Sequence, residues 1–389
     1  MKKCCSRITV VLLLILASIT LPTRLSEAQD SRSQISPRMP SEKPVEQVFK
    51  NIKVLKGMPQ SQLYPTMRFM AASLGFQCGS CHVIKNFIDA AADDKPEKQT
   101  ARQMIKMVID LNQQFQGNPA VTCYTCHRGL RAPQGAPLLP LPIASTSATG
   151  GAPAGMSTGS LQPSADDVLN KYLAAIGGAA ASERITSCAL KGTTTTAIGP
   201  TVAYESEQSV PDKGHEVFTL PTLSGRSCAG DSRCEYERVI DGRQGWLKSG
   251  AGVQELVGEQ LGDQKSAFLL FQILRLKDQY ASFRYSGHDR MNDRGVNVLD
   301  AVRSDGKSER LYFDIESGLL RRRISYLRTL IAAIPQQTDF EDYRDVDGLK
   351  VPFTITMAYV DAGSQPIVRR FSEIKLNVPI PESKFEKPR

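Results

Sequence analysis

The amino-acid sequence is typical of a multidomain protein in which a small all-α module precedes an α+β domain with a large, curved antiparallel sheet. Between residues 41 and 130 the apolar side chains recur with helical spacing, whereas after residue 164 they alternate with polar ones. The intervening residues 131–163 contain six prolines, five glycines and seven serines or threonines. A chain of 389 residues is also longer than a single hydrophobic core usually supports, so more than one domain is expected.

Composition and charge exclude several classes of protein. Apolar residues make up 41% of the chain and charged residues 23%, which argues against a disordered or fibrous protein. The formal net charge is +8, but residues 1–28 hold four basic side chains and one acidic one, so the rest carries +5. A charge this small does not predict a nucleic-acid partner. No apolar run reaches the roughly 18 residues of a membrane helix, so no transmembrane span is expected after residue 28.

The first 28 residues have the three features of a secretory signal peptide. A basic flank at Lys2, Lys3 and Arg7 precedes an apolar run over residues 8–20. Ser26-Glu27-Ala28 then provides small residues at both positions of a cleavage site. An uncleaved membrane anchor is the alternative, although the run is short for a span. We therefore expect a periplasmic protein, and association with a membrane stays open.

Four of the cysteines that follow the signal peptide lie in two Cys-x-x-Cys-His motifs, at 78–82 and 123–127. This pattern is the attachment signal of a c-type haem. Two thiols on one helical turn can add to the two vinyl groups at one edge of a porphyrin, and the next residue presents its imidazole to the iron. We therefore predict two covalently bound haem c groups. Their attachment residues are Cys78, Cys81, Cys123 and Cys126, with His82 and His127 as the proximal iron ligands.

Three other kinds of site also use cysteine pairs. A thioredoxin-like pair follows a strand in a βαβ unit, and neither motif does. A zinc site could use all four thiolates, but 41 residues separate Cys81 from Cys123, which is more than in paired zinc knuckles. Simple disulfides would not need the histidines, of which the whole chain has only four. Haem attachment is therefore the favoured interpretation.

Three short helices are predicted around the two motifs. The first lies between Ser41 and Gly57, the second over residues 65–75 and the third over residues 100–117. Each has an apolar stripe at helical spacing. The stripes are Val45, Val48, Phe49, Ile52 and Leu55; Met67, Met70 and Leu74; and Met104, Met107, Val108, Leu111 and Phe115.

Each motif therefore follows a helix that carries methionines. A thioether is a known partner of haem iron and raises its potential relative to a second imidazole. Methionines on an apolar stripe also commonly belong to a core, and an iron without a distal ligand is a further alternative. We predict Met67 as the distal ligand of the first haem and Met107 as that of the second, with Met70 and Met104 as alternates.

Two stretches of this region carry a family resemblance: LYPTMRFMAASLGFQCGSCH at 63–82, and ARQMIKMVIDLNQQF…VTCYTCHRG at 101–129. They resemble the cytochrome c subunit of photosynthetic reaction centres, most specifically at Ser73-Leu74-Gly75 and at CYTCHRG. The resemblance implies electron transfer. It also implies an axial methionine eleven residues before the first cysteine of a motif, here Met67. The family protein carries four haems, whereas this chain has motifs for two. The last haem of the family often takes a distal histidine, which residues 29–130 do not supply.

Residues 131–163 are predicted to form a flexible linker, because a stretch so rich in Pro, Gly, Ser and Thr cannot bury enough surface to order itself. A loop packed on the surface is the alternative. The predicted organisation is then a signal peptide at 1–28, a dihaem module at 41–130, the linker, and a β-rich domain at 164–389.

The C-terminal region begins with a helix that Ser164 caps and Gly177-Gly178 closes. Apolar residues then alternate along predicted strands, and Asp-Gly pairs at 241, 305 and 347 mark turns between them. Residues 267–276 (AFLLFQILRL) are predicted to form an internal helix across the sheet. The alternating residues include Leu311, Phe313 and Ile315, and Val351, Phe353, Ile355, Met357 and Tyr359.

Three stretches of this region also carry a resemblance: YLAAIGGAAASERITSCALKG at 172–192, VDGLKVP at 346–352 and PIPESKF at 379–385. They are similar to the LolA-like outer-membrane lipoprotein-sorting superfamily. Those proteins fold as an unclosed barrel whose concave face holds lipid or lipoprotein acyl chains. The resemblance implies an open, LolA-like barrel with a lipid or lipoprotein as candidate ligand.

The remaining cysteines and basic residues have structural interpretations. Cys228 and Cys234 flank a short loop and are predicted to form a disulfide, which leaves Cys188 buried in a strand. The run Arg321-Arg322-Arg323 is predicted to be a solvated strand edge, with an anionic-lipid site as the alternative. His215 and His288 are expected to be exposed or hydrogen-bonded rather than to bind metal.

Together these observations predict a periplasmic dihaem electron carrier with an appended β-rich binding domain. Its partners are expected to be redox proteins in the periplasm or at a membrane. The C-terminal region has no Gly-rich phosphate loop, nucleophile elbow or paired metal motif, so no catalytic residues are predicted. One competing function is a dihaem peroxidase, which needs an open iron beside an acid–base group. The other is an envelope lipid-binding protein with a redox accessory domain.

Overall fold

The computed structural model describes residues 42–83, 91–114, 121–133, 162–196, 199–221, 233–250, 252–265, 268–361 and 365–389. The predicted signal peptide and most of the predicted linker lie outside these residues. Residues 39–389 form one compact unit. Within the described ranges, no helix combines the length and the apolar character needed to cross a membrane.

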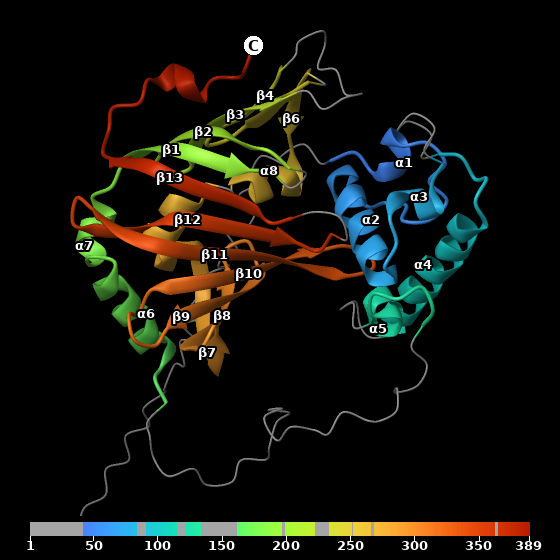
Figure 1. Ribbon diagram of the computed structural model, residues 1–389, viewed down its shortest axis with the longest axis horizontal. Coiled ribbons are helices and arrows are strands. Elements are labelled where there is room, and N and C mark those ends of the chain that lie inside the picture. The colour runs from blue at the N-terminus through green and yellow to red at the C-terminus, as the bar shows by residue number, and fades with distance from the viewer. Residues whose placement is uncertain are drawn as a thin grey trace, which may run out of the picture. The chain divides into compact units, whose positions relative to one another are not determined.

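The N-terminal part of this unit is helical (Figure 1). One close backbone contact joins the end of its second helix to the segment after the second cysteine motif. Gly75 there has φ 64°, and a Cβ atom on it would lie 2.3 Å from the Gly129 carbonyl oxygen, so only glycine fits. The helices of this part are α1 (Val45–Val48), α2 (Gln60–Leu74), α3 (Cys78–Cys81), α4 (Pro96–Gln114) and α5 (Cys123–His127).

The three helices predicted around the motifs are present, but their bounds differ. The first is a single turn, because Phe49 at its C-cap is already extended, and the positive φ values of Asn51 and Leu55 keep the helix from continuing. Helix α2 begins at Gln60, before the predicted start at Pro65. Pro59 is its N-cap residue, and Pro65 inside the helix removes only one backbone hydrogen bond, so the helix continues through it. Helix α4 likewise begins early, at Pro96, whose fixed φ suits a first helical position.

The predicted apolar stripe of α4 is wrong in part. The helix buries Ile105 and Val108, whereas Met104 and Met107 are 40% and 45% exposed. Asn112 is buried in place of a hydrophobic residue, because its side chain bonds both the amide and the carbonyl of Val121 just before the second motif. Phe115 lies outside the described residues.

The C-terminal part contains a thirteen-stranded antiparallel sheet (Figure 1), which confirms the predicted large sheet. Its strand order is β6-β5-β4-β3-β2-β1-β13-β12-β11-β10-β9-β8-β7, so consecutive strands are neighbours and β1 pairs with β13. The strands are β1 (Ser187–Thr195), β2 (Thr201–Ser209), β3 (Lys213–Pro221), β4 (Arg233–Asp241), β5 (Gly245–Ser249), β6 (Gly252–Leu256), β7 (Tyr280–Met291), β8 (Arg294–Arg303), β9 (Ser308–Asp314), β10 (Leu320–Arg328), β11 (Ala333–Val346), β12 (Leu349–Tyr359) and β13 (Ile367–Leu376).

Two helices complete the main core against this sheet, α6 (Ala165–Ala175) and α9 (Leu269–Leu274). Ser164 caps α6 as predicted, and its side chain accepts a hydrogen bond from the Asp167 amide. The hydroxyl of Tyr172 in α6 donates a hydrogen bond of 2.7 Å to the carbonyl oxygen of Ile273. The sheet supplies alternating buried residues, as the period of two predicts. On β12 these are Leu349, Val351, Phe353, Ile355 and Met357.

The other short helices lie at turns of the chain. Helix α9 lies within the internal helix predicted over residues 267–276 but is shorter, and a 3₁₀ turn follows it. Residue 267, in the predicted span, is outside the described residues. The remaining elements are α7 (Ala179–Glu183), α8 (Gly258–Lys265), η1 (Leu276–Gln279) and η2 (Glu382–Phe385).

The prediction of a solvated edge for Arg321-Arg322-Arg323 is wrong, because β10 lies between β9 and β11 inside the sheet. Neighbouring residues of a strand face opposite sides. Arg322 makes two bonds of 2.6 and 2.9 Å with the Asp339 carboxylate, whereas Arg323 is only 8% exposed. Cys188 is fully buried in β1, as predicted. The predicted Cys228–Cys234 disulfide lies outside the described side chains.

The core of the helical part includes residues from the sheet part. Ile331 and Ala332, in the turn between β10 and β11, have no exposed surface. Ile331 belongs to the apolar cluster of Met70, and Ala332 packs in a second cluster with Phe69. Within the compact unit, the β10–β11 turn therefore serves as core for α2.

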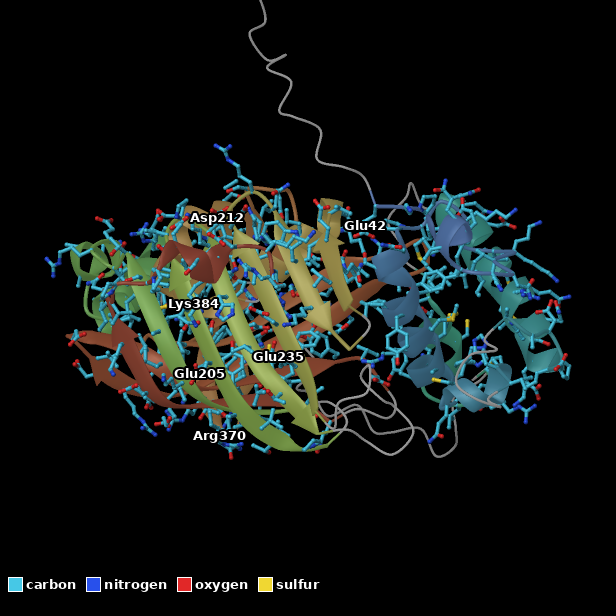
Figure 2. All side chains as sticks on the ribbon, turned by 90° about the horizontal axis from the view of Figure 1, so that it is seen from above. Glu42, Glu205, Asp212, Glu235, Arg370 and Lys384 are labelled. Atoms are coloured by element: carbon cyan, nitrogen blue, oxygen red, sulfur yellow. The ribbon has the colours of Figure 1, made fainter. Side chains whose placement is uncertain are left out.

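The C-terminal segment η2 contacts β3 and β4 (Figure 2). Its Lys384 also forms an ion pair of 3.1 Å with the carboxylate of Glu207 on β2. Beneath it His215 is 4% exposed, with Nδ1 2.7 Å from Glu207 Oε2 and Nε2 3.1 Å from Glu237 Oε1. Burial alone lowers the pKa of His215, but the hydrogen bonds and charges of these carboxylates outweigh it, so the pKa is raised. The expectation of a hydrogen-bonded His215 is confirmed. His288 contacts the Tyr285 hydroxyl at 3.0 Å.

We predict that the free energy of unfolding falls as pH rises through neutrality, and that His215→Gln removes most of this dependence. The folded protein holds a proton on His215 more tightly than the unfolded chain does. This stabilisation is therefore complete below the unfolded pKa of about 6.5 and is lost as pH rises through the higher folded pKa. Urea unfolding between mildly acidic and mildly alkaline pH measures it. His288→Gln, on an exposed histidine, is the control, and an equal effect in both variants would contradict the assignment.

Candidate functional site

Each Cys-x-x-Cys-His motif forms one helical turn. In α3 the two cysteines are the first and last residues, and the His82 amide donates to the Cys78 carbonyl at 3.0 Å. In α5 the turn starts with a capping box between Thr122 and Thr125. Residues three apart lie on the same side of a helix. The two thiols of each motif therefore share one side of their turn.

The motif cysteines are free thiols. Cys78 and Cys126 are exposed, whereas Cys81 and Cys123 are half-buried. Burial raises the pKa of Cys81 and of Cys123 above that of an ordinary thiol. Redox-active and metal-binding cysteines instead have a lowered pKa. Among the described residues, no three His, Cys, Asp or Glu side chains are grouped so as to hold a metal ion.

His127 is oriented by backbone carbonyls. Its Nδ1 atom lies 3.1 Å from the carbonyl oxygens of both Leu130 and Arg131. A carbonyl can only accept a hydrogen bond, so the ring proton is assigned to Nδ1. The lone pair then remains on Nε2, which is the arrangement that an iron-binding imidazole requires. Both His127 and His82 are half-buried.

The four candidate methionines have different surroundings. Met70 is 9% exposed, and Met67 packs half-buried against the same apolar cluster, which also touches Cys123. Met104 and Met107 lie on one side of α4, and this helix packs against α3, the first motif. The structure thus gives Met70 a core position, whereas it leaves Met104 and Met107 accessible.

Large apolar side chains are exposed in the helical part, at the second motif and on α2 and α4. Tyr64 is 62% exposed, Tyr124 56% and Leu130 51%, in addition to Met104 and Met107. Exposed apolar surface of this kind usually marks a binding face. Paired thiols on one turn, a histidine directly after them and exposed apolar side chains in the same helical part are the features that a covalently bound haem needs. The residues present therefore fit a haem c at each motif.

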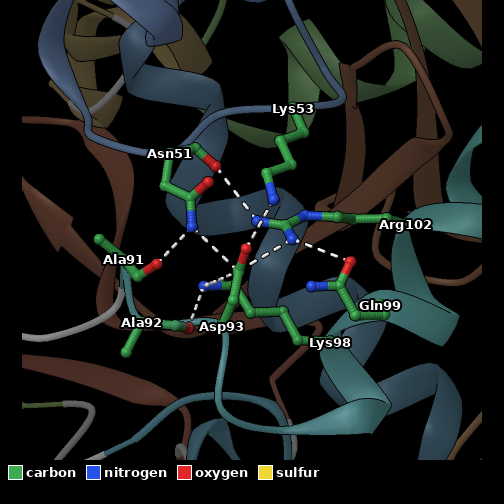
Figure 3. Close-up of polar contacts among 8 residues, drawn as sticks. All are labelled: Asn51, Lys53, Ala91, Ala92, Asp93, Lys98, Gln99 and Arg102. Atoms are coloured by element: carbon green, nitrogen blue, oxygen red, sulfur yellow. Dashed lines mark hydrogen bonds and ion pairs between the residues drawn. The ribbon is translucent and has the colours of Figure 1, made fainter.

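A carboxylate network holds α4 in place (Figure 3). Asp93 accepts hydrogen bonds from Asn51 at 2.9 Å and Lys53 at 2.7 Å, and it pairs with Arg102 at 2.9 Å and Lys98 at 3.4 Å. The hydrogen bonds from Arg102 and then Lys53 hold the pKa of Asp93 far below its usual range. The network joins α4, and with it Met104 and Met107, to the chain before α2.

Sequence reasoning missed Asp93. The basic side chains of Lys98 and Arg102 stand four residues apart, which places them on one side of a helix. That spacing predicts a shared acidic partner, but many carboxylates could serve. The contacts from Asn51 and Lys53 arise from tertiary packing, so nothing in the local pattern indicates them.

We predict that Asp93→Asn lowers the midpoint of thermal unfolding at neutral pH by a few degrees, because four polar partners lose their shared charge. A lowered carboxyl pKa stabilises the fold above the unfolded value of about 3.9 and ceases to do so as pH falls through the folded pKa. The difference between the variant and the parent should therefore narrow in acid. Far-ultraviolet circular dichroism measures both effects. Asp110→Asn, at an exposed carboxyl on the same helix, should leave the midpoint unchanged, and an equal loss there would contradict the role of Asp93.

Comparison with known proteins supports the cysteine motifs. Residues 17–173 match the family of the photosynthetic reaction centre cytochrome C subunit. The chain is 40% identical over 85 residues to cytochrome c-554 of Chloroflexus aurantiacus, a match that covers 20% of each protein. It is 34% identical over 93 residues to the photosynthetic reaction center cytochrome c subunit of Thermochromatium tepidum, covering 23% of this chain and 22% of that protein. The match thus spans less than a quarter of either relative.

The sheet part was compared with solved structures. A LolA superfamily protein from Nitrosomonas europaea aligns with 58% of this chain and 99% of its own, at 14% identity and a TM-score of 0.39. The observed open antiparallel sheet agrees with the fold that the sequence predicts for this part. The N-terminal part is, on its motifs and its relatives, similar to cytochromes c of the reaction-centre type.

Proposed function

We propose that this chain is a periplasmic dihaem c-type cytochrome that transfers electrons and that its sheet part is a binding or docking domain. The observation that carries the proposal is that each Cys-x-x-Cys-His motif forms a single helical turn with both cysteines on one side. Similarity to cytochromes c supports it. Haem c, when bound, supplies an iron that cycles between two oxidation states. The chain's own residues attach and orient it, and no catalytic residue is required.

The proposed division of work follows the geometry. Cys78 and Cys81 attach the first haem, Cys123 and Cys126 attach the second, and His82 and His127 are the proximal ligands. The two carbonyl contacts of His127 fix the plane of its ring and place the proton of the neutral imidazole on Nδ1, so that the Nε2 lone pair faces the iron. Partial burial of Cys81 and Cys123 keeps water from the attachment side, and low polarity of this kind helps to set a haem potential.

Met67 and Met107 are the proposed distal ligands, with Met70 and Met104 as alternates. Met67 is only half-buried, so its thioether can leave the apolar cluster at lower cost than that of Met70. Met107 is 45% exposed and can turn toward an iron without opening the core. Thioether ligation on both irons favours an electron carrier, whereas a peroxidase requires one iron with an open position.

The proposed location and partners rest on the first 28 residues and on the cytochrome similarity. A signal peptide directs the chain to the periplasm, where c-type haems are exposed to soluble or membrane-bound redox proteins. The sheet part is then the docking domain. It packs directly against α2 through the β10–β11 turn, so a partner docked on it is held beside the helical part. A lipid or lipoprotein is the ligand class that the LolA-like sequence resemblance brings to this domain.

We predict that the exported protein carries two covalent haems and that Cys78→Ala with Cys81→Ala leaves one. The second motif has its own turn and its own histidine, so it should still be loaded. A pyridine haemochrome assay with intact-mass measurement counts the haems. Cys188→Ala removes a buried thiol outside both motifs and should retain two haems. Colourless protein, or zinc in place of iron, would refute the cytochrome proposal.

We also predict that both ferric haems show the near-infrared methionine-to-iron band, and that Met67→Ala and Met107→Ala each remove one of the two. If an alternate is the ligand, the band is lost in Met70→Ala or Met104→Ala instead. Met58→Leu, at a fully buried methionine, is the matched control and should keep both bands. A high-spin ferric signal in the unmodified protein would count against the carrier and for the peroxidase.

A further inference from the structure

A cavity of about 340 Å³ lies within the curve of the sheet. Its walls include Arg238 of β4, Arg303 of β8 and Arg323 of β10. These strands are far apart in the strand order, so the sheet must curve round to bring them to one cavity. The volume is near the lower end of small-molecule sites, which run from roughly 300 to 1,000 Å³.

Arg323 is a buried cation with an incomplete set of partners. Arg323 is only 8% exposed, and its Nη1 atom donates a hydrogen bond of 2.7 Å to the side-chain amide oxygen of Gln272. Its Nε atom is shielded from solvent, and among the described residues it has no hydrogen-bond partner. No carboxylate in this part of the chain forms an ion pair with Arg323. A buried charge without a counter-ion is costly to the folded state.

Arg238 is also incompletely balanced. It is 9% exposed and pairs with Glu216 at 2.8 Å, but Arg369 shares the same carboxylate at 3.1 Å. Two guanidinium groups therefore depend on one buried anion. The Nε atom of Arg238 has no hydrogen-bond partner among the described residues.

The remaining charges on the wall largely compensate one another. Arg303 lies 3.7 Å from Glu309, and Lys307 bonds Asp263 at 2.6 Å. Glu309 additionally accepts a hydrogen bond from the Tyr280 hydroxyl. Arg303 also lies 3.5 Å from Asp305, so three carboxylates face these two cations. Arg323 and the Arg238–Glu216–Arg369 group each add one positive charge, so the cavity keeps a net positive charge.

We propose that this cavity binds a phosphate group, carried by a small soluble molecule or by the headgroup of a lipid. The planar guanidinium fork matches the oxygens of a phosphate and bonds them in pairs. A phosphate carries between one and two negative charges near neutral pH, opposite in sign to the excess on the wall. The inference is independent of haem attachment, because none of the proposed haem ligands lines the cavity.

Two probes applied to the full-length, haem-loaded protein test this inference. Inorganic phosphate is titrated by calorimetry, and phosphatidylcholine vesicles with and without phosphatidic acid are used in co-sedimentation. Binding of both probes, or of phosphate alone, assigns a soluble phosphate site that headgroups can share. Binding of phosphatidic-acid vesicles alone assigns a lipid headgroup. If the protein binds neither probe, the proposal is overturned.

Arg323→Gln should weaken binding at least about tenfold, as expected for a lost charge-assisted bond. Arg322→Gln removes the same charge from the adjacent residue, whose partner is Asp339, and should leave binding unchanged. Equal weakening in both variants would mean general charge attraction and would overturn the site. If Arg323→Gln does not fold, Arg303→Gln replaces it, because the buried Nη1 atom of Arg303 has no hydrogen-bond partner among the described residues. This variant should also weaken binding, and unchanged binding would overturn the site.

Discussion

One buried carboxylate joins four strands of the sheet. Glu216 has no exposed surface, accepts a hydrogen bond from Tyr204 at 2.8 Å and pairs with Arg238 and Arg369. Burial raises the pKa of Glu216, but the two arginines outweigh it, so the group stays ionised. These contacts connect β2, β3, β4 and β13 across the interior, and removing one member would leave the others as unpaired buried charge. The interior of the sheet is therefore charged where a simple fatty-acyl site would be apolar.

The helical part has only a small hydrophobic core of its own. Its main cluster contains few fully buried residues, and one of them, Ile331, comes from the sheet part. Small domains with thin cores usually depend on a metal, a crosslink or a partner surface. Here the β10–β11 turn provides a partner surface on one side of α2, and covalent haem would provide apolar mass at the motifs.

The sequence predicted the features that depend on local pattern. Alternation predicted the buried face of β12, Ser164 and Gly177-Gly178 predicted the ends of α6, and the cysteine spacing predicted single-turn motifs. Features that depend on long-range contact were not predictable. Arg323 looks like a surface charge until β10 is found between β9 and β11. The Asp93 network likewise joins residues about forty positions apart, and Asn112 replaces an expected apolar residue because it bonds Val121.

Helix α2 connects the two functional regions. Ser61 and Pro65 line the cavity of the proposed phosphate site, Met67 and Met70 face the apolar cluster of the helical part, and Gly75 lies against Gly129 after the second motif. The hydrogen bonds of an α-helix hold its residues at a rise of about 1.5 Å per residue. The cavity and the second cysteine motif therefore contact one and the same helix. The β10–β11 turn packs against this helix as well, at Phe69 and Met70, so the sheet part is more than a tethered accessory.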